Sequence, residues 1–476
     1  MTAEDLFNRV LTKAKEFGLL PKNEGRTLTD PKGNSIVRNN LFDISFNDGS
    51  AFFAYLSNEE ETTGPYSDFS FVIFPDKKNS IETCVVALGV GSSGFRNDYQ
   101  LASLPGLRRL FLKLDSENSF FKTSFDDIES TSSELLNEIR SNYPLLRTVI
   151  ESYKTVLPAC KIVSFDDEER ALNIVFTWLA TYAKMRSWGT AVQKKAIETQ
   201  LEKINSPQLP NDEEKIYQLL EKRKYVILQG APGTGKTHTA LKIAEKYDKV
   251  FFEQFHAETN YADFVYGLEP DIQQNGTQMR FKAKEGILYQ AIKYAKEHIN
   301  EKVLLIIDEI NRANLSNVLG PVFYLFEYQS GDRNINIKLG DQVISKLPDK
   351  INVIATMNTA DRSLAVVDFA LRRRFAWYTL RPHEIKAENG MKFMDKVYNK
   401  FADIFFEFAT DDELNLQPGQ SYFIVHKDNK EEEMKERMIY ELMPLIKEYL
   451  AEGYLLKAKD SFCDLFLKET GLLMYE

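Results

Sequence analysis

A stretch near the middle of the chain carries residue types that suit the binding of a nucleoside triphosphate. It reads Gly230-Ala-Pro-Gly233-Thr-Gly235-Lys236-Thr237, after the apolar run 225–228 and before an amphipathic segment at 240–247. This order predicts a strand, a phosphate loop and a helix, because glycines let successive backbone N–H groups point at phosphate oxygens and a helix N-terminus adds its positive dipole end. The residues expected to surround the nucleotide are Gly230, Pro232, Gly233, Thr234, Gly235, Lys236, Thr237 and His238.

Lys236 and Thr237 have distinct expected roles in this loop. The Lys236 ammonium is expected to reach the β- and γ-phosphates, and the Thr237 hydroxyl is expected to ligate Mg²⁺. A glycine-rich turn without function rarely combines the full G-x-x-x-x-G-K-T spacing with a strand before it and a helix after it. The pattern therefore predicts a site for a nucleotide with Mg²⁺, and it leaves GTP and ATP open because the loop contacts phosphates and not the base.

Acidic and amide side chains follow two further apolar runs. Asp308 and Glu309 come directly after the run 303–307, and Asn358 comes after the run 351–356. Asp308 is expected to hold the Mg²⁺ through water and Glu309 to polarise the attacking water, which is the division of labour that phosphoryl transfer requires. Asn358, beside the acidic strand, can orient that water. Two acids can also mark a simple strand exit, but a phosphate loop upstream favours the catalytic interpretation.

The composition is that of a globular protein with several domains. Its 476 residues are 43% hydrophobic and 27% charged, with a net charge of −10. At about 150 residues per domain, roughly three domains are expected. The negative charge argues against an overall basic surface, although a local basic groove remains compatible with nucleic acid.

The cysteines and the apolar runs indicate the compartment. Cys84, Cys160 and Cys463 lie far apart and form no C-x-x-C pair, so neither a disulfide framework nor a zinc site is expected. No apolar run approaches the ~18 residues of a membrane span. The first residues lack the basic and apolar regions of a signal peptide. We therefore expect a cytoplasmic protein without a membrane partner.

The N-terminal region is expected to be mainly β. Residues 3–18 show helical spacing, and strands are expected at 41–46, 51–56, 69–74 and 83–88. Helical segments are expected at 120–158 and 168–204, ahead of a proline-containing linker at 206–212.

A second glycine-rich sequence, Gly89-Val-Gly91-Ser-Ser-Gly94, lies in this region. Its G-x-G-x-x-G spacing after an expected strand is typical of dinucleotide-binding folds. No parallel βαβ pattern surrounds it, however, and Pro105 interrupts the segment that follows. We therefore favour a flexible or ligand-contacting loop. Aromatic and basic residues lie nearby. They could contact nucleic-acid phosphates or form a solvated face, and they are Phe95, Arg96, Arg108, Arg109 and Lys113.

Three motifs in the second half of the chain resemble those of the McrB-type AAA+ GTPases, the motor subunits of modification-dependent restriction systems. They are Gln254-Phe-His256 with Tyr261-Ala-Asp-Phe264-Val-Tyr-Gly267, Leu305-Ile-Ile-Asp-Glu-Ile-Asn311-Arg312-Ala-Asn, and Met357-Asn-Thr-Ala-Asp-Arg-Ser-Leu-Ala-Val-Val-Asp-Phe-Ala-Leu-Arg-Arg-Arg-Phe375. The resemblance covers roughly residues 213–455.

The resemblance implies roles for five residues. Asn358 would be the sensor residue, and Asp361 and Arg362 would complete the signature. Arg373 and Arg374 are candidates for an arginine finger that reaches the nucleotide of a neighbouring subunit and offsets charge on its γ-phosphate. A basic helix end that complements the helix dipole is the alternative for these arginines.

The expected fold class is α/β: an AAA+ P-loop domain, with a parallel sheet flanked by helices and with a helical lid, preceded by an α+β, mainly β N-terminal module and a helical connector. The expected boundaries are 1–118 for the N-terminal recognition module, 119–205 for the connector, 206–212 for the linker, 213–382 for the AAA+ core and 383–476 for the lid.

Three features of the second half of the chain receive no single expected role. Two expected hairpins, at 268–282 and 333–344, could face a ring channel or a partner subunit, or be ordinary surface hairpins. Gly419-Gln420-Ser-Tyr422-Phe423 matches the family's lid motif. Gln420 stands where the family usually has His, so it receives no role.

The resemblance also implies GTP in place of ATP, a homo-oligomeric, hexameric ring, and a separate McrC-type nuclease subunit that stimulates hydrolysis. By the same resemblance the N-terminal module would recognise DNA modified at cytosine. The residues alone show neither the recognised base nor the oligomer number. The alternative is an AAA+ ATPase that acts as a remodelling or switch protein, whose N-terminal module binds a protein. Salt-dependent DNA binding by that module would separate the two hypotheses.

Overall fold

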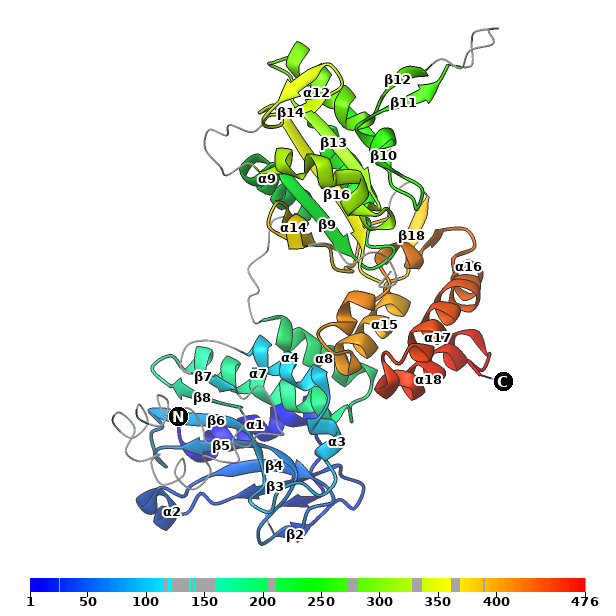
Figure 1. Cartoon of the computed structure of the whole chain (residues 1–476). Helices are drawn as coiled ribbons and strands as arrows, with labels where there is room; N and C mark the ends of the chain where they lie inside the picture. The colour runs from blue at the N-terminus through cyan, green and yellow to red at the C-terminus, as the bar shows by residue number, and fades with distance from the viewer. Residues whose placement is uncertain are drawn as a thin grey trace. The chain divides into compact units, whose positions relative to one another are not determined.

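The computed structural model describes residues 1–24, 26–114, 119–121, 137, 141, 159–203, 211–271, 281–327, 336–360, 369–387 and 390–475. The chain divides into two compact units, residues 1–208 with 406–408, and residues 209–405 with 409–476 (Figure 1). None of the helices in the described ranges is both long enough and apolar enough to cross a membrane.

The first unit contains a six-stranded antiparallel sheet. Its strands run in the order β3 (Ser35–Asn39), β4 (Phe53–Ser57), β5 (Phe69–Pro75), β6 (Thr83–Val90), β8 (Ala159–Ser164) and β7 (Ser119–Phe121). A short separate pair joins β1 (Asn23–Glu24) to β2 (Thr27–Leu28). The central strands β5 and β6 are buried along their whole length, which agrees with their apolar sequences.

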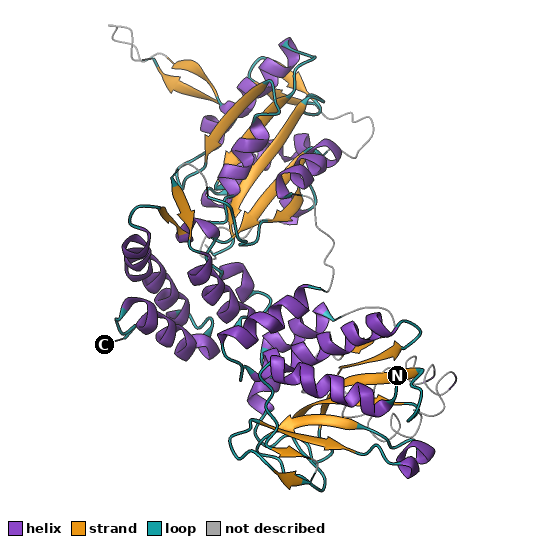
Figure 2. Cartoon of the chain, turned by 180° about the vertical axis from the view of Figure 1, so that it is seen from behind, coloured by secondary structure: helices purple, strands orange, loops and turns teal. Residues whose placement is uncertain are grey.

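Helices α1 (Ala3–Glu16) and α7 (Glu168–Arg186) pack on this sheet (Figure 2). Helix α1 starts with a capping box between Thr2 and Asp5 and buries an apolar stripe that includes Leu6 and Val10. Helix α7 contributes Trp178 to the same core. Further helices in the described part of this unit include α2 (Asp43–Asp48), α3 (Tyr99–Ala102), α4 (Pro105–Lys113) and α8 (Ala191–Glu202).

The structure corrects two predictions for this unit. Residues 41–46 do not form a strand, because Asp43 opens helix α2 and Gly49 ends it in a left-handed conformation with φ +74°. The helical segment 168–204 is divided, because Ser187 adopts φ +53° between α7 and α8. The strands near 51–56, 69–74 and 83–88 are confirmed. The prediction of helix at 120–158 lies almost wholly outside the described residues.

The second unit contains a five-stranded parallel sheet. The strand order is β10 (Lys249–Gln254), β13 (Val303–Asp308), β16 (Ile351–Asn358), β9 (Tyr225–Gly230) and β17 (Ala376–Thr379). The apolar runs at 225–228, 303–307 and 351–356 form β9, β13 and β16, and sequence reasoning missed the edge strand β17. The predicted fold class is confirmed, since a parallel sheet flanked by helices follows a mainly β module and precedes a helical region.

Alternate residues of β13 enter two different cores, so both faces of the parallel sheet are covered. Leu304 and Ile306 pack with helices α9 (Asp212–Arg223) and α10 (Lys236–Ala244). Leu305 and Ile307 pack with α12 (Ile287–Glu297) and α13 (Leu315–Leu319). Burial on both faces explains why these strands read as continuous apolar runs.

Two hairpins extend from this sheet domain, as predicted. Strand β11 (Tyr266–Pro270) pairs with β12 (Phe281–Glu285), and β14 (Ile337–Leu339) pairs with β15 (Gln342–Ile344). Gly340 has φ +56° at the turn of the second hairpin. The turn is held by a hydrogen bond from the Tyr289 hydroxyl to Asp341.

The C-terminal lid is helical, as predicted. It comprises α15 (Asp395–Phe408), α16 (Lys430–Arg437), a π-helical turn at Met438–Leu442, α17 (Met443–Ala451) and α18 (Lys459–Thr470). Phe401 and Phe405 of α15 are buried. An additional short pair, β18 (Met391–Phe393) with β19 (Ile424–His426), was not predicted.

Candidate nucleotide-binding site

The phosphate loop occupies the turn between the end of β9 at Gly230 and the start of α10 at Lys236. Gly233 and Gly235 have φ values of +80° and +81°, a region that side chains with a Cβ rarely enter. Gly235 is also the N-cap of α10, so the helix N-terminus faces the loop. Within the loop, Pro232 precedes Gly233 and Thr234 lies between the two glycines, and His238 is exposed in the first turn of the helix.

The Lys236 ammonium is held inside the loop. The side chain is buried, and Nζ donates to the carbonyl oxygens of Gly230 and Ala231, both at 3.0 Å, and to Asn358 Oδ1 at 2.6 Å. A buried ammonium needs such acceptors because desolvation without hydrogen bonds is costly. The same cation is therefore positioned where phosphate oxygens can provide stronger, charged acceptors.

Thr237 and Asp308 lie together beneath the loop. Thr237 Oγ1 and Thr356 Oγ1 each donate to Asp308 Oδ1 at 2.7 Å. A hydroxyl and a carboxylate are the hard oxygen ligands that Mg²⁺ prefers, and the ion usually completes its shell with waters and phosphate oxygens. Among the described residues no cluster of three or more His, Cys, Asp or Glu could hold a metal, and a Mg²⁺ site of this kind needs none.

Asn358 connects the loop lysine to Glu309. Its Oδ1 accepts from Lys236, while its Nδ2 donates to both Glu309 carboxylate oxygens, at 2.8 and 3.1 Å. The Glu309 backbone has φ +53°, and its N–H donates to Thr356 Oγ1 at 3.0 Å. A left-handed glutamate costs on the order of 1–3 kcal/mol and persists only where its surroundings fix it, which is common at functional sites.

Arg373 and Arg374 share one carboxylate but differ in burial. Both pair with Glu327, Arg373 at 3.0 Å. The Arg374 side chain is 7% exposed and lies over the Phe323 ring, whereas the Arg373 side chain is 70% exposed. Arg373 therefore has the freedom to reach another molecule, while Arg374 is part of the folded core.

The structure brings Lys236, Thr237, Asp308, Glu309 and Asn358 together at the carboxyl ends of three adjacent strands, where open parallel sheets bind ligands. Asp361 and Arg362 lie outside the described residues, so their roles stay predictions. Sequence reasoning missed Thr356, whose hydroxyl contacts both Asp308 and the Glu309 backbone. A hydroxyl residue inside a mainly apolar strand was the available signal.

The lid also contacts the loop, which sequence reasoning did not anticipate. The Gly419 N–H donates to the Pro232 carbonyl at 2.9 Å, and Gln420 Nε2 donates to the Thr234 carbonyl at 2.9 Å. The Tyr422 ring lies against Gly233, and burial raises the pKa of Tyr422, so its hydroxyl stays neutral.

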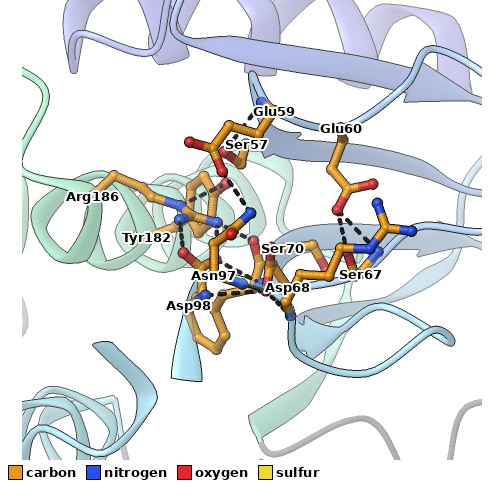
Figure 3. Close-up of polar contacts among 12 residues, drawn as sticks. Ser57, Glu59, Glu60, Ser67, Asp68, Ser70, Asn97, Asp98, Tyr182 and Arg186 are labelled. Carbon is orange, nitrogen blue, oxygen red and sulfur yellow. Dashed lines mark hydrogen bonds and ion pairs between the residues drawn. The ribbon is translucent and has the colours of Figure 1, made fainter. Parts of the chain in front are cut away.

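The second glycine-rich sequence forms a different structure. Strand β6 is antiparallel to both β5 and β8, so no βαβ unit is present around it. The Asp68 carboxylate accepts hydrogen bonds from the N–H groups of residues 96, 97 and 98, at 2.6, 2.8 and 3.1 Å (Figure 3). A protein carboxylate thus takes the backbone N–H groups that follow the glycines, and with the antiparallel strands this argues against the dinucleotide interpretation.

This loop is also anchored from helix α7. Arg186 makes a buried ion pair with Asp98, with 2.7 Å between NH2 and Oδ2, and its NH1 donates to Asp98 Oδ1 at 2.8 Å (Figure 3). Asp98 in turn accepts from the Phe69 N–H at 2.9 Å. Carboxylates and a buried guanidinium therefore fix the loop from several sides.

The comparisons with known proteins agree with the nucleotide site. Residues 225–375 match the family model described as "AAA domain (dynein-related subfamily)". The chain is 43% identical over 179 residues to the Type IV methyl-directed restriction enzyme EcoKMcrB subunit of Escherichia coli (strain K12). Together the two matches support a McrB-type AAA+ protein.

A second relative is the Type II restriction enzyme BsuMI component YdiS of Bacillus subtilis (strain 168), 24% identical over 196 residues. The matches cover 36% and 32% of this chain and 38% and 55% of the two relatives, so the chain spans about half or less of each. A crystal structure from Cytophaga hutchinsonii, 16% identical and covering 43% of this chain and 56% of that one, has a TM-score of 0.26 and carries no argument.

Proposed function

We propose that this McrB-type protein is a Mg²⁺-dependent nucleoside triphosphatase that uses GTP in preference to ATP and acts as the motor of a restriction system. The carrying observation is the convergence of Lys236, Asp308 and Glu309 around the phosphate loop, linked by Asn358. Lys236 would bind the β- and γ-phosphates, Thr237 and Asp308 would hold Mg²⁺, and Glu309 would activate water.

Assembly into a homo-oligomeric ring, with six copies as the expected number, would complete this site. Arg373 is exposed and carries a charge that could stabilise the γ-phosphate of a neighbouring copy. Hydrolysis would then depend on contact between subunits. Arg374, buried with Glu327, would support Arg373 from behind instead of contacting nucleotide.

The names of both relatives, a methyl-directed restriction enzyme subunit and a restriction enzyme component, support a role in defence against foreign DNA. In this proposal the N-terminal module binds DNA, with a modified base as the favoured target, and a separate McrC-type nuclease cuts it in the cytoplasm. Hydrolysis by this chain would drive the cleavage.

The experiment is steady-state hydrolysis of GTP and ATP by the full chain, with and without an added McrC-type nuclease. We expect faster hydrolysis of GTP and a further increase with the nuclease. Binding of methylated and unmethylated DNA at several salt concentrations tests the recognition step, since phosphate contacts make DNA affinity fall with salt. Preference for ATP with no DNA binding would instead support a remodelling ATPase whose N-terminal module binds a protein.

A further inference from the structure

Three successive lid residues donate hydrogen bonds to three successive carbonyls of the phosphate loop. The backbone N–H groups of Gly419 and Ser421 donate to Pro232 O and Gly233 O, at 2.9 and 3.1 Å. Between them, the side-chain Nε2 of Gln420 donates to Thr234 O at 2.9 Å. Two of these contacts belong to the backbone, so only the third depends on the identity of a side chain.

The lid and the loop approach each other at backbone distance. A Cβ added to Gly419 would lie 2.0 Å from the carbonyl carbon of Gly233 and 2.2 Å from the Thr234 nitrogen. A Cβ on Gly233 would come within 2.4 Å of Ser421 Oγ. Because neither position has space for a side chain, the register of the lid on the loop is fixed.

This register determines where the N–H groups of the loop point. In a trans peptide the C=O of one residue and the N–H of the next point in opposite directions. Holding the carbonyls of residues 232, 233 and 234 toward the lid therefore turns the N–H groups of 233, 234 and 235 away from it, toward the side where a phosphate loop binds its ligand. One of them, the Thr234 N–H, makes a long contact of 3.4 Å with Ala231 O.

The Thr234–Gly235 peptide is the one that the Gln420 side chain holds. It borders Gly235 at φ +81°, where the lack of a Cβ leaves rotation of the peptide weakly restricted by sterics. Gln420 is 8% exposed. The orientation of its amide is assigned from this contact, because the reverse orientation would place Oε1 against the Thr234 carbonyl oxygen. Its Oε1 is buried and has no hydrogen-bond partner among the described residues.

We propose that Gln420 is a positioning residue that keeps the Gly235 N–H directed at the phosphates of the bound nucleotide, and so couples the lid to nucleotide affinity. The inference rests on the proposed function, because it concerns the same site. Gln420 faces the carbonyl side of the loop and does not touch the reacting atoms. Its loss should weaken nucleotide binding more than it slows hydrolysis at saturation.

The test is titration of the full chain with a fluorescent GTP analogue in Mg²⁺, for wild type, Gln420→Glu and Gln420→His. Glutamate removes the donor and places a carboxylate oxygen against Thr234 O, so we expect Kd to rise about tenfold or more. An imidazole N–H can replace the amide donor, so we expect Gln420→His to stay within about threefold of wild type. Single-turnover hydrolysis at saturating GTP should change by less than about threefold in both.

Gln342→Glu is the matched control for charge and size. Gln342 Oε1 accepts from Lys296 Nζ at 2.8 Å, so a carboxylate keeps that contact and Kd should not change. If Gln420→Glu lowers the thermal stability of the nucleotide-free chain, Gln420→Met, of similar length and without a donor, replaces it with an expected rise in Kd of about fivefold.

The outcomes separate this inference from the proposed function. If wild type binds the GTP analogue and the Kd values of Gln420→Glu and Gln420→Met both lie within twofold of its Kd, the inference is overturned and the proposed function is not. Equal weakening by Gln420→His would also overturn it, since a donor would then not be what matters. Failure of the wild-type chain to bind any nucleotide would overturn the proposed function.

Discussion

Two glycine-rich loops follow strands in this chain. In one of them the protein hydrogen-bonds the backbone N–H groups, and in the other it hydrogen-bonds the backbone carbonyl groups. In the loop after β6, the N–H groups of residues 96–98 are taken by the Asp68 carboxylate. In the loop after β9, the lid takes the carbonyls of residues 232–234. The first arrangement fills an anion site with a side chain of the protein, and the second turns N–H groups toward a site for a ligand.

The sheets around the loops explain the difference. Strand β9 lies inside a parallel sheet, where β13 and β16 bring Asp308 and Asn358 to the same edge. Strand β6 lies between antiparallel neighbours, which place no second strand end with the same polarity beside it. A glycine pattern therefore indicates phosphate binding only together with the sheet that surrounds it. Substitutions near β9 should therefore alter the rate of nucleotide hydrolysis, and substitutions near β6 should alter the stability of the N-terminal unit.

The largest expected effect is that of Arg373→Ala on hydrolysis. Loss of an exposed finger should lower kcat about 10³-fold with little change in melting temperature. Arg374→Ala is the paired variant, and because it removes a buried side chain that packs on the Phe323 ring and pairs with Glu327 it should lower stability. Hydrolysis assays and thermal unfolding of both variants check this. Equal rates for Arg373→Ala and wild type would remove Arg373 from the site.

The next effect is that of Glu309→Gln, which keeps the shape of the side chain and removes its basicity. We expect hydrolysis to fall about 10²–10⁴-fold while GTP binding persists. The measurement is a single-turnover assay combined with a binding titration. Near-normal turnover would show that another group activates the water.

A third test concerns the loop after β6. Arg186→Ala should destabilise the N-terminal unit by about 3–5 kcal/mol, because it leaves Asp98 without its buried partner. Urea-dependent hydrogen exchange of peptides from β5 and α7 measures this. Arg9→Ala, which breaks an exposed pair with Glu168, is the control and should cost at most about 1 kcal/mol. A change in GTP affinity in Arg186→Ala would contradict the conclusion that the loop after β6 serves stability and not nucleotide binding.

The smallest expected effect is that of Asp68→Asn. Asparagine tolerates the φ of +62° at this position and still offers an acceptor, so only the charge is lost, at a cost of about 1–2 kcal/mol. The same exchange assay on residues 91–98 measures it. Asp48→Asn, in an exposed turn, should have no effect. An unchanged exchange rate in Asp68→Asn would mean that the carboxylate does not hold the loop.

The convergence of the candidate site residues could be predicted from the sequence because each part of the site is local. Apolar runs ending in Gly230, Asp308 and Asn358 are patterns within single strands, and parallel pairing necessarily brings their ends together. The edge strand β17 was missed because it is short and only half-buried, so its alternation is weak. The strand expected at 41–46 was wrong because Asp43 and Gly49 favour a capped helical turn over the apolar alternation.

Contacts between distant segments could not be predicted in this way. The pairing of Gln420 with Thr234 joins positions 186 residues apart, and no local pattern specifies it. The same is true of Arg186 with Asp98, and of Arg373 and Arg374, whose different burial depends on Glu327. The roles assigned to the site residues and the domain boundaries stay predictions, although β8 and α7 pack in the same compact unit as β4, β5 and β6.

The most direct test of the central claim is hydrolysis of GTP and ATP by wild type and Glu309→Gln, measured over a range of protein concentrations. We predict that wild type hydrolyses GTP faster than ATP, that activity per chain rises with concentration as subunits assemble, and that Glu309→Gln loses it at every concentration. Hydrolysis that persists in Glu309→Gln, or no hydrolysis by wild type at any concentration, would contradict the account.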